Sequence, residues 1–367
     1  MEICFLTSSH RATDTRLFDL EAKYLVKNGF SITIIGFHDR YEIKDNIKII
    51  PIKKFNHSFF EKIFSIFTIL KLSLSNPSKI YHFHDPELII VGVFLKIIGK
   101  KVVYDIHEDY ESKLTSKLKK FRLIGKFITK LWWVYEKISS SFFDYLVVAD
   151  NHISQKFTNK NKIVIPNVPS EEFWKNISRE RTDSNEFRII YVGGISKNRG
   201  ITQTLHAMDF VRHNNVTFNI IGDINDKELK KMIIDRKNVF WHGRLPWSEI
   251  GKRMINSDLG IVLLQPAMDY NNISGEGIVK LWEYLSVGLP VLISNFPNLE
   301  KLCSDLQFGM SVDPTDPKKI ASAIDYLIDH PEERKKMGSN GQKAVREEYN
   351  SEFKLKDLLI AYEKILQ

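Results

Sequence analysis

Short apolar, β-branched runs alternate with helix-like segments along almost the whole chain, and this rhythm is interrupted once. The interruption is a polar stretch at residues 169–186. The runs before it are EICFL, FSITIIG, IKIIPI, KIYHFH, KVVYDIH and DYLVVAD, and those after it are FRIIYVGG, VTFNIIGD, NVFWHG, DLGIVLL and LPVLIS. Such alternation is typical of parallel strands crossed by helices. The sequence therefore predicts an α/β protein with two parallel sheets.

The length of 367 residues suits two domains. We predict a first α/β domain over residues 1–168, a linker over 169–186, a second α/β domain over 187–345 and a C-terminal helix over 346–367. Open parallel sheets bind ligands at the carboxyl ends of their strands. We therefore expect the site in a crevice between the two domains.

Composition and the chain start indicate a cytoplasmic globular protein. Apolar residues make up 43% and charged residues 27% of the chain. The start, MEICFLTSSH, is typical of a strand and not of a signal peptide, and Cys4 and Cys303 alone form no disulfide framework. The most apolar stretch, FFEKIFSIFTILKLSLS, is interrupted by charges and is too short to span a membrane. We expect no transmembrane helix.

The formal net charge of +8 favours anionic partners: phosphates, nucleic acid or acidic lipid headgroups. Within residues 116–138, apolar side chains recur at helical spacing with lysines between them. They are Leu118, Phe121, Ile124, Ile128, Leu131, Tyr135 and Ile138. Such a stripe is most often a core face. The alternative is a basic, Trp-rich helix that touches an anionic membrane surface.

The segment YVGGISKNRGI predicts a strand, a glycine pair, a basic loop and a helix that begins near Ile201. Gly193 and Gly194 let backbone N–H groups approach an anion, and Lys197 and Arg199 offer charge to a diphosphate. The pattern is neither GxGxxG nor a P-loop, so it supports neither a dinucleotide fold nor an ATPase. A tight turn with a solvated basic loop explains it equally well.

A second candidate segment is SGEGIVKLWEYLSVGLPVLIS, residues 274–294. Glu276 and Gly277 lie in the approach to a short helix that carries Lys280 and Glu283. Carboxylates accept hydrogen bonds from sugar hydroxyls, and a lysine neutralises phosphate. The alternative is a glutamate that stabilises the positive end of a helix.

The segments KIYHFHDPE and KVVYDIHEDY each end a strand with histidine and carboxylate side chains. His82 and His84 share a strand face, so a metal site with His107 and either Asp85 or Asp105 is conceivable. No third ligand has diagnostic spacing, and we predict no metal. The histidines would instead point into the substrate crevice or be satisfied within its wall.

The chain contains no Asp-x-Asp pair, which nucleotide-sugar enzymes commonly use to hold a divalent ion. The charge of a diphosphate substrate would then be met by Lys, Arg and backbone N–H groups.

In order and spacing, these motifs resemble the retaining glycosyltransferases of family 4 over essentially the whole chain. The segments that carry the resemblance are SSHRATDTRLFDLEAKYLVKNGFSITIIG, HFHDPE, VYDIHE, IPNV, YVGGISKNRGI, GIVKLWEYLSVGLPVLIS and the last segment, HPEERKKMGSNGQKAVREEYNSEFKLKDLLIAYEKIL. The resemblance implies the GT-B architecture, two facing Rossmann-like domains with an interdomain cleft. Residues 1–168 would form the acceptor side and residues 187–345 the nucleotide-sugar side, and the last helix would cross back onto the first domain.

The resemblance also implies roles for single residues. Glu283 would bind the ribose of the donor, Glu276 the hydroxyls of its sugar, and Arg199 its diphosphate. His107 would lie near the donor sugar and the reacting centre. His107, Arg199 and Lys280 would be the catalytic residues. The other donor-binding positions are Gly193, Gly194, Lys197 and Gly277, and the N-terminal cleft positions are Asp14, Arg16, His84 and Glu108.

Two positions depart from the pattern of that family. Its two glutamates are usually separated by seven residues, whereas six separate Glu276 from Glu283, and Gly275 occupies the expected position. Gly194 stands where the family often has arginine, so Arg199 and Lys280 must neutralise more of the diphosphate.

We therefore expect a metal-independent retaining glycosyltransferase of hexosyl or N-acetylhexosaminyl type, without a cofactor. It would move a sugar from a nucleotide diphosphate to a hydroxyl of a saccharide or lipid-linked saccharide, in surface polysaccharide biosynthesis. An anionic membrane surface is a further expected partner, and the location is the cytoplasm, including the inner face of the cell membrane. The alternatives are a nucleotide-sugar epimerase of the same fold and a basic nucleic-acid-binding protein; the latter is disfavoured because no binding module is present.

Overall fold

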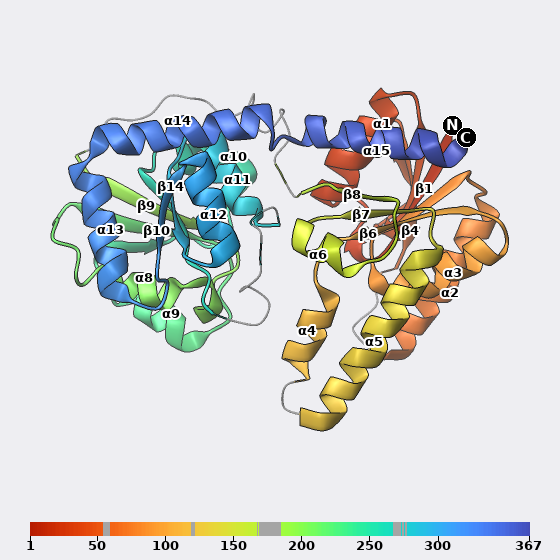
Figure 1. Ribbon diagram of the computed structural model, residues 1–367, viewed down its shortest axis with the longest axis horizontal. Helices are drawn as coiled ribbons and strands as arrows, with labels where there is room; N and C mark the ends of the chain where they lie inside the picture. The colour runs from red at the N-terminus through yellow and green to blue at the C-terminus, as the bar shows by residue number, and fades with distance from the viewer. Residues whose placement is uncertain are drawn as a thin grey trace. The chain divides into compact units, whose positions relative to one another are not determined.

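Two compact units make up the computed structural model of the protein (Figure 1). The first consists of Met1–Asn167 and Ser351–Gln367, and the second of Val168–Asn350. The structure describes residues 1–53, 59–118, 122–166, 168, 185–266, 273, 275 and 277–367. Most of the predicted linker, residues 169–184, lies outside them. Each unit is built on a parallel sheet, which confirms the predicted α/β class.

The first unit contains an eight-stranded sheet in the order β3-β4-β2-β1-β5-β6-β7-β8. All neighbouring strands are parallel except β3, which pairs antiparallel with β4 at the edge. The strands are β1 (Glu2–Arg11), β2 (Ser31–Phe37), β3 (Glu42–Lys44), β4 (Ile47–Ile52), β5 (Ile80–Phe83), β6 (Lys101–Ile106), β7 (Tyr145–Val148) and β8 (Lys162–Val164).

Helices cover both faces of this sheet, because successive side chains of its strands are apolar on both sides. In β1, Cys4 and Leu6 join one core cluster, and Ile3 and Phe5 join the other. The helical elements are η1 (Thr15–Ala22), α1 (Lys23–Lys27), α2 (Phe59–Ser75), η2 (Pro86–Leu88), α3 (Ile89–Ile97), α4 (Tyr110–Lys117), α5 (Arg122–Phe142), α6 (Asn151–Lys156) and α15 (Ser351–Leu366).

The second unit contains a six-stranded, wholly parallel sheet in the order β11-β10-β9-β12-β13-β14. Its strands are β9 (Phe187–Val192), β10 (Val216–Ile221), β11 (Val239–Trp241), β12 (Leu259–Val262), β13 (Val291–Ser294) and β14 (Gly309–Val312). Its helical elements are η3 (Lys197–Arg199), α8 (Ile201–Ala207), α9 (Lys227–Ile234), α10 (Trp247–Ile255), α11 (Val279–Ser286), α12 (Pro297–Leu306), α13 (Pro317–Asp329) and α14 (Pro331–Glu347).

The same alternation divides the core of the second unit. Ile189 and Tyr191 of β9 face the cluster with α8, α9 and α13, whereas Ile190 and Val192 face the cluster with α10, α11 and α12. Several helices begin where an aspartate accepts backbone N–H groups of the first turn, as Asp316 does for α13. Local sequence and burial pattern therefore specify the same elements.

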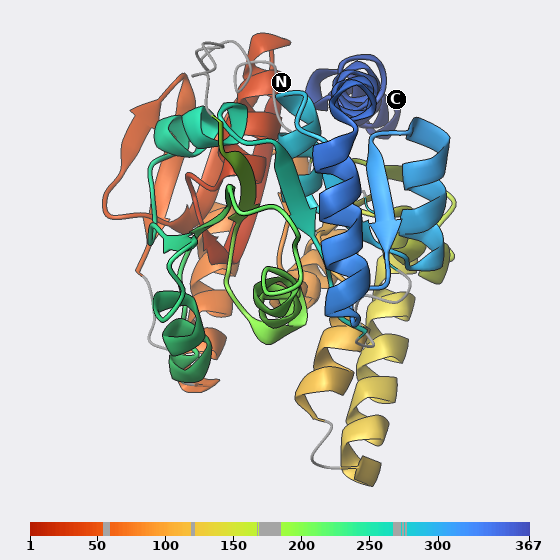
Figure 2. The same ribbon diagram turned by 90° about the vertical axis from the view of Figure 1, so that its left-hand side faces the viewer.

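The stripe at residues 116–138 does not form one helix against the core. Helix α4 ends at Lys117 and α5 begins at Arg122, and the two helices lie side by side and project together from the first unit (Figures 1 and 2). Ile124 and Leu131 are 67% and 54% exposed. The interpretation of this stripe as a core face is therefore wrong. Phe121 lies outside the described residues.

Across the described residues, the longest and most apolar helices fall short of what is needed to cross a bilayer.

Helix α15 completes the first unit from the far end of the chain. Leu355, Leu358 and Tyr362 are almost fully buried, in the same cluster as Ile3 and Phe5 of β1. Together with η1 and α1, this helix therefore covers one face of the sheet, although it lies hundreds of residues from β1 in the sequence.

We expect Leu358→Ala to lower the free energy of unfolding of the first unit by about 2–5 kcal/mol, since it removes a fully buried side chain. Denaturant unfolding measures this change. Ile360→Ala, on the exposed side of the same helix, should cost less than about 0.5 kcal/mol. Equal losses in both variants would contradict the packing of α15.

Candidate functional site

The glycine loop after β9 lies beneath a lysine side chain from α11. Gly193 has a φ of 126°, and a Cβ added to it would lie 2.9 Å from Lys280 Nζ. The same ammonium lies 3.9 Å from the centroid of the Tyr191 ring. The Tyr191 hydroxyl donates a hydrogen bond to the Gly194 carbonyl at 2.7 Å, which ties the strand end to the loop. Lys280 of α11 therefore lies over the loop at the carboxyl end of β9.

Lys280 and Glu283 lie one turn apart on α11, and each has a shifted pKa. Burial, with the positive charge of Arg199 nearby, holds the pKa of Lys280 well below its usual range. Burial raises the pKa of Glu283 to about 7, although Lys280 opposes this shift. Glu283 is only 6% exposed. Buried titratable groups with strongly shifted pKa values are typical of binding sites for charged ligands.

Tyr284 fixes α11 against β9, because its hydroxyl accepts a hydrogen bond from the Val192 N–H at 2.7 Å. The approach to the helix is fixed at Gly275. Its carbonyl accepts hydrogen bonds from the Ile278 N–H at 3.0 Å and the Trp282 Nε1–H at 3.1 Å.

Gly275 has a φ of 94°, and an added Cβ would lie 2.7 Å from Leu302 Cδ2. A glutamate at this position would be strained. The six-residue spacing to Glu283 is thus built into the backbone of this chain.

The remaining predicted donor-binding residues are placed differently. Gly194 is exposed, and an added Cβ would meet no atom within 4 Å. Lys197 is half-exposed and pairs with Glu228 of α9 at 2.6 Å, away from Lys280. Gly277 is described and precedes α11, whereas Glu276 lies outside the described residues. The structure therefore brings together Gly193, Lys280, Arg199 and Glu283.

A buried ion pair organises the second candidate region, in the first unit. Arg16 binds Asp105 through two hydrogen bonds, from Nε at 3.0 Å and from Nη2 at 3.1 Å. Its Nη1 donates to the Ile165 carbonyl at 2.8 Å, and its Nε lies 3.2 Å from Glu21 Oε1. One guanidinium group therefore contacts two buried carboxyl groups and donates a hydrogen bond to the carbonyl that follows β8.

Asp105 contacts two histidines, which follow the neighbouring strands β5 and β6. Its Oδ2 lies 3.3 Å from His84 Nδ1 and 3.1 Å from His107 Nε2. These arrangements follow from the register of β5 and β6, which pairs Phe83 with Tyr104 and so sets His84 beside Asp105. The side chain of His107 is 13% exposed and forms the solvent-facing end of the cluster.

A further pair extends the cluster to the end of β1. His10 Nδ1 lies 2.9 Å from Asp85 Oδ1, and the rings of His10 and His107 stack at 5.6 Å. Asp85 also accepts hydrogen bonds from the Thr7 hydroxyl and from the Ser8 and Ser9 N–H groups. The hydrogen bond to Asp85 raises the pKa of His10.

The carboxyl groups on either side of Arg16 titrate in opposite directions. Burial alone would raise the pKa of Asp105, but Arg16 and His107 outweigh burial and hold it well below its usual range. Burial and the nearby Asp105 raise the pKa of Glu21 well above its usual range. Asp105 thus carries the charge and Glu21 the proton. Burial also lowers the pKa values of His82 and His84, so both rings are neutral at pH 7.

Sequence reasoning missed Glu21, His10 and Tyr362. The Tyr362 hydroxyl of α15 lies 2.5 Å from His82 Nδ1, and Glu21 Oε2 lies 3.9 Å from the same nitrogen. His10 ends a strand with a polar side chain, as His84 does, and that signal was available. Nothing in the local sequence connects Tyr362 to this cluster, because it comes from the other end of the chain.

Two predicted cleft residues lie outside the histidine cluster. Asp14 caps η1, where its carboxylate accepts the Arg16 N–H at 3.1 Å. Glu108 is exposed and pairs with Lys113 of α4. Arg16, His84 and His107 are brought together, whereas these two carboxylates are not. The placement of the site in a crevice between the domains stays a prediction.

Glu21, His82, His84 and Asp105 offer possible metal ligands within 4.8 Å of one another. Within the described ranges, Nε2 of each of these histidines has no hydrogen-bond partner. Both carboxyl groups, however, already contact the Arg16 guanidinium. A cation among them would lie against a fixed positive charge, so the set fits a metal poorly.

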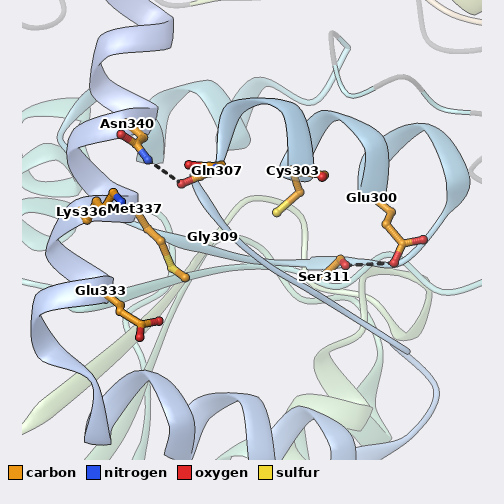
Figure 3. Close-up of a pocket in the computed structure, with 10 residues that line it drawn as sticks. Glu300, Cys303, Gln307, Gly309, Ser311, Glu333, Lys336, Met337 and Asn340 are labelled. Carbon is orange, nitrogen blue, oxygen red and sulfur yellow. Dashed lines mark hydrogen bonds between the residues drawn. The ribbon is translucent and has the colours of Figure 1, made fainter.

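A pocket of about 830 Å³ lies in the second unit beside the edge strand β14 (Figure 3). It is lined by Glu300, Cys303, Ser304, Gln307, Gly309, Ser311, Glu333, Lys336, Met337 and Asn340. Burial raises the pKa of the Cys303 thiol to about 12, which keeps it protonated. None of the predicted site residues lines this pocket, so it is not the candidate site.

Comparison with known proteins shows what this chain is similar to. Residues 172–344, which lie within the second unit, match the sequence model of the family described as Glycosyl transferases group 1. The second unit is therefore similar to a group 1 glycosyltransferase domain, and the chain as a whole has the GT-B fold of solved glycosyltransferases.

Particular proteins show the same likeness over nearly whole chains. The chain is 27% identical over 310 residues, 81% of each sequence, to an uncharacterized 41.2 kDa protein in the cps region of Klebsiella pneumoniae. Sucrose-phosphate synthase from Thermosynechococcus elongatus superposes with a TM-score of 0.75 at 14% identity, over 100% of this chain and 99% of that one. HepE from Anabaena, solved in complex with UDP-glucose, gives a TM-score of 0.74 at 14% identity, over 99% and 100%.

We expect Glu21→Gln to leave the protein at least as stable as the wild type at pH 8, although changes to buried polar groups usually cost about 1–3 kcal/mol. The folded-state pKa of Glu21 is raised, so its contribution is present below the unfolded pKa and is lost as pH rises through the folded pKa. The melting temperature of the wild type should therefore fall relative to the variant between pH 5 and pH 9. Thermal melts across this range test it, with the exposed Glu347→Gln as control. A parallel pH dependence of variant and wild type would refute a protonated Glu21.

Proposed function

We propose that the protein is a retaining glycosyltransferase that moves a hexosyl or N-acetylhexosaminyl group from a nucleotide diphosphate donor to an acceptor hydroxyl. The bond between the anomeric carbon and the phosphate oxygen breaks, and the acceptor oxygen forms the new bond on the same face. The acceptor proton leaves with the nucleoside diphosphate or to solvent. Neither a metal nor a cofactor takes part.

The observation that carries this proposal is the cationic loop of the second unit. Lys280 Nζ lies over Gly193 and Tyr191, next to the charge of Arg199, in the domain that matches the group 1 family. The positive charge of Arg199 disfavours the protonated form of Lys280 in the free protein. A diphosphate bound beside Lys280 would favour the protonated form instead, and it develops further negative charge as it departs.

Each residue then has a role. Lys280 and Arg199 stabilise the departing diphosphate, with Gly193 and Gly194 allowing it to approach the loop. The Glu283 carboxylate accepts hydrogen bonds from the ribose hydroxyls, and Glu276 contacts the donor sugar. His107, oriented by Asp105 in the first unit, acts near the reacting centre. The UDP-glucose bound to HepE supports a nucleotide sugar as the donor of this chain too.

The acceptor we propose is a saccharide or a lipid-linked saccharide. The Klebsiella relative in a cps region supports a role in capsular or another surface polysaccharide. Such acceptors are assembled at the cytoplasmic face of the cell membrane, where we place the protein.

Thermal stabilisation by UDP, GDP and ADP sugars and by CMP sugars in excess EDTA tests the donor site. We expect one base to raise the melting temperature, by the equivalent of about 2.7 kcal/mol at 100 times its dissociation constant. Glu283→Ala and Glu283→Gln should weaken binding by about 10- to 150-fold, because a charged hydrogen bond is worth about 1.5–3 kcal/mol. Glu300→Ala, on α12, is the matched control.

Three outcomes would contradict the proposal. Sugar transfer at the wild-type rate by the Glu283 variants would show that Glu283 of α11 has no role in donor binding. A stabilising effect that appears only when magnesium is restored would overturn metal independence. Conversion of the donor alone, without acceptor, would identify an epimerase instead.

Donor binding at alkaline pH should be accompanied by proton uptake. The free protein holds the pKa of Lys280 well below its usual range, and an anionic diphosphate beside it raises that pKa again. Glu283, with a pKa of about 7, is already ionised at this pH and contributes little. Calorimetry in buffers of different ionisation enthalpy measures the uptake, at up to about one proton.

Lys280→Met should abolish this uptake while weak binding persists. The same uptake in Lys280→Met and in the wild type would assign the proton to another group.

A further inference from the structure

Helix α5 is amphipathic, but it exposes its apolar side and packs its small and polar side against the first unit. The side chains that it buries against the first unit are small or polar: Gly125, Thr129, Glu136, Ser139 and Ser140. Trp132 is its one large residue packed against the core cluster. A helix of this length normally buries its apolar stripe. Here the stripe is left outside.

The exposed stripe, called the α5 apolar face below, is continuous. Its members are Leu123, Ile124, Phe127, Ile128, Leu131, Val134, Tyr135, Ile138 and Phe142. Their exposed fractions run from 37% for Val134 to 80% for Leu123. At about 100° per residue they fall within an arc of about 140° along a helix roughly 30 Å long. Patches of this kind mark interaction sites and are not scattered exposure.

Lysines border one edge of this face. Lys126, Lys130 and Lys137 project within an arc of about 40° that adjoins the apolar arc. Lys137 Nζ lies 4.7 Å from the centroid of the Trp133 ring. The single carboxylate of α5, Glu136, is buried and accepts a hydrogen bond from the Tyr104 hydroxyl at 2.8 Å. The outward side of α5 thus carries positive charge alone within the described residues.

We propose that the α5 apolar face docks on an anionic lipid bilayer, with the helix lying in the interface and its lysines at the level of the headgroups. Apolar side chains on one arc and lysines at its edge are the arrangement that such helices use. A second copy of the chain fits less well, because its own α5 presents no outward carboxylate among the described residues that would offset the lysine edge. Charge complementarity therefore selects the membrane.

Neighbouring elements support the same orientation. Helices α4 and α5 project together from the first unit (Figures 1 and 2). The side chains of the α5 apolar face are exposed. Helix α3, which packs beside α5, adds exposed apolar side chains at Ile90, Phe94 and Ile97. The docked surface would thus extend beyond one helix.

Cosedimentation with vesicles tests the proposal. We expect the wild type to bind vesicles of phosphatidylglycerol mixed with phosphatidylcholine at low salt, and to bind pure phosphatidylcholine far less. Phe127→Ser/Leu131→Ser should lose most of this binding, and Lys126→Glu/Lys130→Glu should lower the partition coefficient roughly tenfold or more. Raising the salt concentration should likewise weaken the binding of the wild type to anionic vesicles.

The matched control is Phe210→Ser/Ile234→Ser, which removes two apolar side chains of similar exposure from the second unit and should bind as the wild type does. No binding by the wild type, equal binding to both vesicle types, or full binding by the α5 variants would overturn the proposal. So would a wild-type dimer in light scattering that Phe127→Ser/Leu131→Ser converts to monomer, because the face would then belong to a second copy.

This inference stands apart from the assignment of the donor site. The α5 variants should keep the nucleotide-induced melting shift of the wild type, whereas Glu283→Ala should keep vesicle binding. Failure of one proposal is therefore distinguishable from failure of the other.

Discussion

The guanidinium group of Arg16 holds the polar interior of the first unit together. Two carboxyl groups buried near one another would cost several kcal/mol each without a cation between them. Arg16 binds Asp105 with two hydrogen bonds, contacts Glu21 and reaches the carbonyl after β8. Once Asp105 is fixed and ionised, His84 and His107 have a common acceptor, and the outermost ring is oriented toward solvent.

The candidate site of the second unit sets like charges near one another, whereas the first unit pairs opposite charges. The two cations near the glycine loop repel one another, and the glutamate one turn along α11 is shifted toward its neutral form. The first unit thus offsets its buried charges among its own residues, whereas the second sets Lys280 near a like charge, and on this we base the proposal of an anionic ligand. This contrast explains why the donor role is assigned to the second unit and an orienting role to the histidine cluster.

The fold was largely predictable, because the alternation of buried strands and amphipathic helices is a local pattern that both sheets confirm. Lys280 and Glu283 could be named because they lie on one short helix next to a strand end. Their shifted pKa values could not, since these depend on burial in the folded unit and, for Lys280, on Arg199, which is far away in sequence. Tyr362 was invisible for the same reason. The stripe on α5 was recognised, but periodicity does not tell which environment an apolar face meets, and the expectation of a core face was wrong.

The division of the chain also bears on the order of folding during synthesis. The second unit is one continuous segment, Val168–Asn350, whereas the first needs Ser351–Gln367 to cover Ile3 and Phe5 and to bring Tyr362 to His82. Domains generally fold as units as they leave the ribosome. The unit that begins at Met1 is therefore completed last: η1 and α1 pack on this face of the sheet, but the side chains of α15 are still missing from the same core. The last helix thus sets the time at which the core of the first unit closes.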